Sequence, residues 1–126
     1  MTTPFKTDEE IKAVVDGFEQ CTTGKAEFTH LSHLTVATFY LRAWNQDEAF
    51  QKMRAGLLRF LKHHDVPLEK YSDEITLAWF QRIQDVLAEL DSRAPLFTQV
   101  NTVIGSLADW DRGRPSRNER EARKVF

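Results

Sequence analysis

Residues 29–44 read THLSHLTVATFYLRAW, and this stretch decides the fold class. At 3.6 residues per turn, one helical face carries His30, His33, Leu34, Ala37, Tyr40, Leu41 and Trp44. The other faces still carry Leu31, Val36 and Phe39. A helix that is apolar nearly all round lies buried among other elements. The sequence therefore predicts an all-α protein with this helix near its centre.

Four further segments show the helical period, and none alternates convincingly with the period of a strand. The first begins at Thr7, where TDEE forms a capping box with Glu10. The others begin at Asn45, at Ser72 or Asp73, and near Pro95, which suits a first helical turn. We expect a single-domain bundle of about five helices. Its core is predicted from the apolar stripes to contain Leu34, Ala37, Leu41, Met53, Leu57, Leu61, Trp79, Ile83 and Val86.

The composition is that of an ordinary globular domain of 126 residues. A formal net charge of -2 argues against a dedicated nucleic-acid binder. The single cysteine, Cys21, excludes an internal disulfide framework and favours a reducing compartment. No secretory signal and no membrane-spanning run is evident, so we expect a soluble cytoplasmic protein with no membrane partner. The sequence leaves open whether the protein forms a homo-oligomer.

The segment 111–126 differs from the rest of the chain. From Arg112 onward it contains six basic and two acidic residues. SRNE, at residues 116–119, is a second possible capping box, which predicts a short C-terminal helix. Two interpretations stay open, a solvated tail and a basic flap over an anionic ligand.

The four histidines are expected to gather at one end of the bundle. Short connections make consecutive helices antiparallel neighbours, which brings alternate helix ends together. The same end is predicted to hold Cys21, His30, His33, His63, His64, Tyr71, Ser72, Asp73, Glu74 and Trp110. This end is therefore the candidate functional site.

A divalent metal, zinc or iron, is the sharpest hypothesis for this end. His30 and His33 lie three residues apart, which makes them neighbours on a helix and able to hold one ion. A catalytic zinc site needs about three protein ligands, and His64 is the candidate third. The alternative is that these histidines only bond loop carbonyls. Lys-His-His at a helix C-terminus is favoured by the macrodipole without any ligand.

Three neighbouring side chains would complete a metal-dependent enzyme acting on a small molecule. Asp73 or Glu74 would be the general base, and Tyr71 would orient the substrate. Trp110, with the basic tail, would form a lid. The competing hypotheses are a non-catalytic module without metal, which binds a small molecule or another protein, and a homo-oligomer subunit whose polar end only caps helices.

The blocks FTHLSHLTVATFYL, MRAGLLRFLKHH and KYSDEITLAWF, followed by LADW and the final EARKVF, resemble a family of small uncharacterised, mainly bacterial helical proteins. The resemblance covers residues 18–126. Its first block is similar to Phe-x-His-x-x-His-Leu, matched by Phe28, His30 and His33. Its third block is similar to Tyr-His-Glu-Thr-Ile-Thr, matched by residues 71–76.

This chain departs from the family pattern at Ser72 and Asp73, which stand where the pattern has His-Glu. If that family histidine is a ligand, the resemblance implies that this chain has lost or rebuilt the site. Asp73 can still do carboxylate work from the glutamate position. The resemblance implies a helical fold and a site location, and it implies no particular reaction.

Overall fold

The computed structural model describes residues 4–107 of the chain. Within this range the elements are α1 (Asp8–Glu19), α2 (His30–Ala43), α3 (Gln46–His63), the 3-10 turn η1 (Leu68–Lys70), α4 (Asp73–Ala88) and α5 (Leu96–Leu107), with no strand. The predicted all-α class with five helices is confirmed. The short C-terminal helix expected within 111–126, and Trp110 with its lid, lie outside the described residues.

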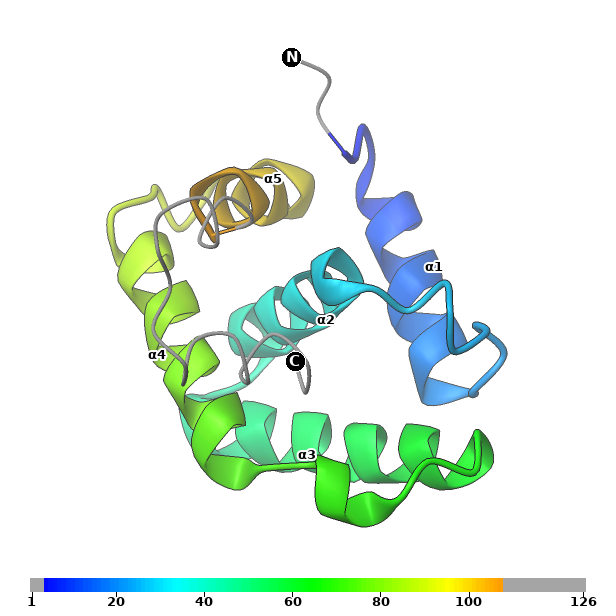
Figure 1. Cartoon of the computed structure of the whole chain (residues 1–126). Helices are drawn as coiled ribbons and strands as arrows, with labels where there is room; N and C mark the ends of the chain where they lie inside the picture. Colours follow the sequence, from blue (N-terminus) through cyan, green and yellow to red (C-terminus); the bar gives the residue numbers. More distant parts are fainter. Residues whose placement is uncertain (1–3, 108–126) are drawn as a thin grey trace.

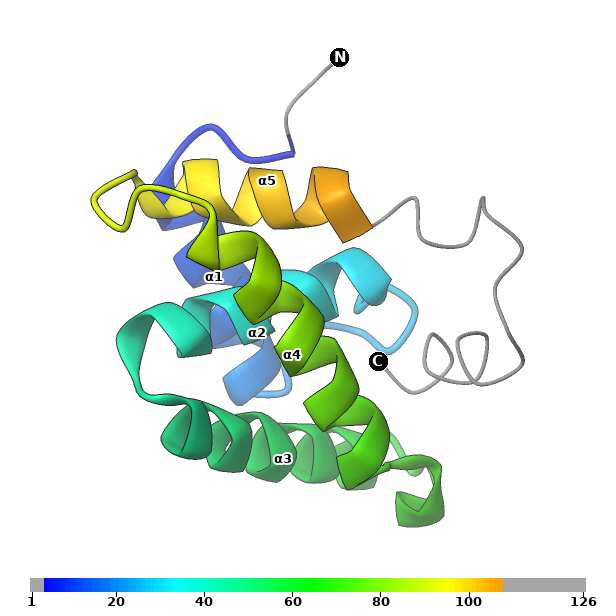
Figure 2. The ribbon, with the colours of Figure 1, turned by 90° about the vertical axis from the view of Figure 1, so that its left-hand side faces the viewer.

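Helix α2 lies at the centre, as its apolar sequence predicts (Figure 1). It packs against each of the other four helices. Around it, α1 contacts α3, α3 contacts α4, α4 contacts α5 and α5 contacts α1. Figure 2 shows α4 crossing in front of α2, with α5 above and α3 below. The outer helices therefore form a ring around α2, and the helix ends do not all gather at two poles.

The predicted helix starts agree with the structure. Thr7 and Glu10 form the complete capping box of α1. The side chain of Asn45 caps α3, and the side chain of Ser72, the first of the two predicted candidates, caps α4. Pro95 differs slightly from expectation, because it precedes the first residue of α5 and lends only its carbonyl to the helix.

The predicted core is confirmed for most of its members. Six of the nine expected residues are buried, namely Leu34, Ala37, Met53, Leu57, Trp79 and Ile83. The other three, Leu41, Leu61 and Val86, are half-buried. Leu41 and Val86 pack against the core from its edge. Leu61 is half-buried because it faces a pocket.

Helices α1 and α3 end in the same hydrogen-bonded turn. After α3, the Val66 amide donates to the Leu61 carbonyl at 2.9 Å, and the Asp65 amide donates to the Lys62 carbonyl at 3.2 Å. These two bonds define the Schellman motif, whose left-handed residue is usually glycine. Here that residue is Asp65 after α3 and Cys21 after α1, both at a φ of 56°. The two turns aim the loops that border the pocket.

Candidate functional site

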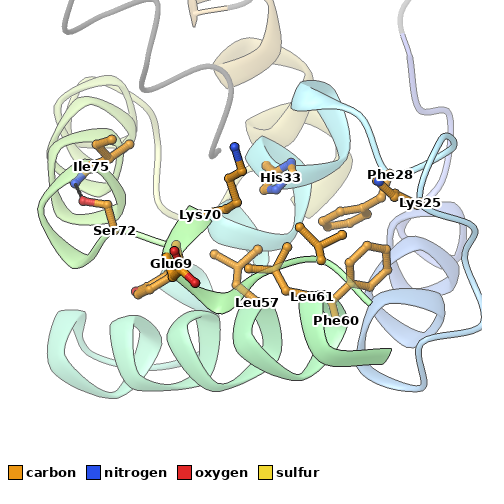
Figure 3. A pocket seen from close by; sticks show the side chains of 12 residues that line it. Lys25, Phe28, His33, Leu57, Phe60, Leu61, Glu69, Lys70, Ser72 and Ile75 are labelled. Carbon is orange, nitrogen blue, oxygen red and sulfur yellow. Dashed lines mark hydrogen bonds between the residues drawn. The ribbon is translucent and has the colours of Figure 1, made fainter. Parts of the chain in front are cut away.

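A pocket of about 680 Å³ opens between α2, α3 and the chain that leads into α4 (Figure 3). Six apolar side chains from four segments line it: Phe28, Leu57, Phe60, Leu61, Val66 and Ile75. Six polar side chains complete the lining: Lys25, His33, Glu69, Lys70, Tyr71 and Ser72. The pocket thus combines an apolar floor with a polar edge.

Stacked aromatic rings form one wall of the pocket. The ring of Phe28 lies 4.9 Å from that of Phe60 and 4.5 Å from that of His33, centroid to centroid. Behind them, Phe18 stacks on Phe28 at 4.8 Å. Gly56 permits this arrangement, because a Cβ atom at that position would lie 2.5 Å from the Phe18 ring. The lack of a side chain at Gly56 therefore leaves room for Phe18 to pack against Phe28 and Phe60.

His33 is the one predicted ligand that lines the pocket. Its Nδ1 lies 2.9 Å from the carbonyl oxygen of Thr29. A carbonyl only accepts, so Nδ1 carries the proton and donates it. Burial lowers the pKa of His33 to about 4, with the bond to Thr29 opposing and nearby His30 adding to the decrease. At neutral pH the pocket therefore contains an uncharged imidazole.

His30 and His64 do not line the pocket. The His30 ring lies edge-on to Trp79 of α4, with centroids 4.8 Å apart. The His64 Nε2 donates to the carbonyl oxygen of Thr23 at 3.2 Å, which ties the end of α3 to the loop after α1. The His64 ring also packs on Phe60. The His64 contact matches the alternative in which the histidines bond loop carbonyls.

No three His, Cys, Asp or Glu side chains in residues 4–107 lie close enough to hold a metal ion. His30, His33 and His64 each have a different neighbour, which explains why the described residues form no such group. The zinc or iron site at these three histidines stays a prediction without support from this geometry.

The predicted catalytic residues are split between the pocket and the surface. Asp73 pairs with Arg54, with Oδ1 and Nε 3.1 Å apart, and both side chains are about half-exposed. Glu74 is exposed in the first turn of α4. Tyr71 does line the pocket, and burial is the main cause that raises its pKa to about 12, with the Thr76 hydroxyl opposing and Asp73 adding. Tyr71 therefore keeps its proton and is a hydrogen-bond donor at neutral pH.

Sequence reasoning did not single out Lys25 and Lys70 at the pocket edge. Lys25 lies in the loop after α1 and Lys70 ends η1, where no hydrophobic period exists to give their direction. The ion pairs of residues 4–107 join Arg54 to Asp73 and Arg93 to Asp91, so neither lysine is neutralised by one. The available signal was that both lysines sit in the short loops that approach the histidine end.

Comparisons with protein-family models, with curated proteins and with solved structures find no significant match to this chain. Among the helices of residues 4–107, none combines the length and the apolar character needed to cross a membrane.

Proposed function

We propose that the protein is a non-catalytic module that binds a small molecule with an apolar body in the pocket between α2, α3 and α4. The observation that carries the proposal is the lining, six apolar side chains beside six polar ones. Small-molecule sites are typically concave and mainly apolar, with a few polar groups that fix orientation. The volume of about 680 Å³ is within the usual range for such sites.

The protonation states of the pocket favour binding over catalysis. General acids and bases work best with a pKa near the operating pH. His33, with a pKa of about 4, is a weak base, and Tyr71, with a pKa of about 12, is a weak acid. Asp73 pairs with Arg54 and does not line the pocket. These side chains can hold and orient a ligand. Their pKa values lie too far from neutral pH for efficient proton transfer to or from it.

The apolar floor supports modest affinity for a rigid ring system. Burying about 200 Å² of apolar ligand surface contributes about 5 kcal/mol before the costs of association, at ~25 cal/mol per Å². A rigid ligand loses little conformational freedom on binding. We therefore expect an uncharged two-ring probe such as naphthalenemethanol to bind with a dissociation constant between micromolar and millimolar.

A blocking substitution with a matched control tests the proposal. Val66 lines the pocket, whereas Leu68, the first residue of η1, is 48% exposed and does not. Val66→Trp should abolish calorimetric binding of naphthalenemethanol, and Leu68→Trp should leave it unchanged. Leu61→Trp is a second blocking variant should Val66→Trp lose its helical circular dichroism. Equal binding by blocked and unblocked proteins, or no binding by the wild type, contradicts the proposal.

The metal-dependent enzyme remains a separate hypothesis with its own measurement. Elemental analysis of protein purified without a histidine tag from metal-supplemented medium measures any bound zinc or iron. Stoichiometric metal that is lost in His30→Ala would favour the metal-dependent enzyme. His30 lies outside the pocket lining, so this loss would report a metal site and not a change in the pocket.

A further inference from the structure

We infer that the ligand of this pocket is an organic acid, an apolar ring-sized body carrying one negative charge, and this inference rests on the binding function proposed above. The charged lining residues are Lys25, Lys70 and Glu69, which leaves one net positive charge. An apolar floor with a cationic edge suits an amphipathic anion. The opposite ligand, an amphipathic cation, would have to approach two ammonium groups to reach one carboxylate.

The two lysines reach the pocket from separate segments. Lys25 comes from the loop between α1 and α2, and Lys70 comes from η1. Figure 3 shows them on either side of His33, with Lys25 beside Phe28 and Lys70 rising next to the imidazole. The carboxylate of Glu69 lies lower, on the side of Leu57.

Lys70 and Ser72 supply donors at this edge. The Ser72 hydroxyl oxygen accepts from the Ile75 amide at 3.2 Å, which leaves its own proton to donate. A carboxylate only accepts, and hydrogen bonds to a charged acceptor are the stronger ones. The edge therefore matches an acceptor headgroup better than a donor headgroup.

The aromatic wall accounts for the body of the ligand. Phe28 and Phe60 are held at 4.9 Å by the packing of Phe18 behind them. Leu61 and Val66 face the same space from α3 and the loop after it. A flat ring placed against this wall would direct a carboxylate toward Lys70 across the pocket.

Three probes with one body and three headgroups test the inference on the full chain. They are naphthalene carboxylate, naphthalenemethanol and naphthalenemethylammonium, titrated by calorimetry at neutral pH and low salt. The carboxylate should bind about tenfold tighter than the alcohol, the scale of one charge-assisted hydrogen bond. The ammonium should bind more weakly than the alcohol.

Lys70→Gln should remove most of the carboxylate preference and leave the alcohol affinity unchanged. Lys12→Gln, the same charge change at an exposed position of α1 outside the lining, should change neither affinity.

The outcomes separate this inference from the binding function on which it rests. Equal affinity for the carboxylate and the alcohol, or a preference for the ammonium, overturns the anionic ligand and leaves the pocket a binding site. A carboxylate preference that survives Lys70→Gln and Lys25→Gln also overturns it. Failure of all three probes to bind overturns the proposed function itself.

Discussion

The first turn of α2 and the turns at its middle have the same helical backbone and opposite surroundings. In the middle, Leu34, Val36 and Ala37 are fully buried among the surrounding helices. In the first turn, Leu31 is 41% exposed, and His33 faces the pocket. The difference arises from the neighbours of each part. Helices surround the middle turns, whereas His33 of the first turn borders a pocket that is also lined by Lys25 of the preceding loop and Lys70 of η1.

The difference indicates that the buried middle of α2 stabilises the fold, whereas the pocket beside its first turn is the candidate binding site. Helix-on-helix packing leaves no space for a ligand, because interiors are close-packed. Loops fill space less completely and bring polar groups such as Lys25, Lys70 and Ser72 to the edge. The following changes test that separation, in order of decreasing effect.

The largest effect is expected in the buried middle of α2. Leu34→Ala should cost roughly 2–5 kcal/mol of unfolding free energy, because it leaves a cavity among packed helices. Leu61→Ala, the same change at the pocket, should cost under about 1 kcal/mol, since its side chain already faces open space. Urea denaturation measures both. Equal losses would show that the pocket side is as tightly packed as the core.

The second effect concerns the aromatic wall. Gly56→Ala should destabilise by about 1–3 kcal/mol, because the new methyl group meets the Phe18 ring. Helix propensity alone predicts the opposite sign, a gain of about 1 kcal/mol. Gly105→Ala in α5 is the control, since a Cβ there meets nothing within 4 Å, and it should show that gain. A gain in unfolding free energy for Gly56→Ala as well would mean that the Phe18 ring moves aside at little cost.

The third effect is a pH dependence at the pocket. The pKa of His33 is about 4 in the fold and about 6.5 when unfolded, so the unfolded chain binds the proton first. His33 therefore stabilises the fold fully above pH 6.5, and that contribution is lost as the pH falls toward 4. His33→Asn, whose amide can replace the Nδ1 donor, should remove a dependence of about 1 kcal/mol across this window. Parallel curves of urea stability against pH for the two proteins would contradict the lowered pKa.

The smallest effect lies in the loop after α3. Asp65 adopts a φ of 56°, which glycine tolerates best. Asp65→Gly should therefore raise the unfolding free energy by about 0.5–1 kcal/mol, and Asp65→Ala should lower it. Thermal unfolding of the pair measures the difference. If alanine stabilised as much as glycine, backbone strain at this turn would not be the cause.

The sequence predicted the parts of the molecule that repeat with helical period. The caps at Thr7, Asn45 and Ser72 and the burial of Leu34 and Trp79 follow from local rules. These rules act within a few residues, so they do not depend on how helices cross.

For the candidate site, the sequence predicts residues but not the directions that the crossing of the helices gives them. Antiparallel packing was expected to bring His30, His33, His64 and Asp73 around one pocket, and of these only His33 lines it. The ring of helices around α2 turns His30 toward α4 and leaves Asp73 beside Arg54 on α3. Directions of this kind depend on tertiary packing, and no period in the sequence encodes them.

Contacts between a bound probe and the protein test directly whether this pocket is the binding site. Nuclear Overhauser effects can be recorded between the ring protons of naphthalene carboxylate and the methyl groups of the full-length labelled protein. We predict contacts to Leu61, Val66 and Ile75 of the pocket, and none to Leu31 or Leu77, which are exposed apolar side chains elsewhere. Contacts confined to Leu31 or Leu77, or none at a saturating probe concentration, would contradict the assignment of this pocket as the binding site.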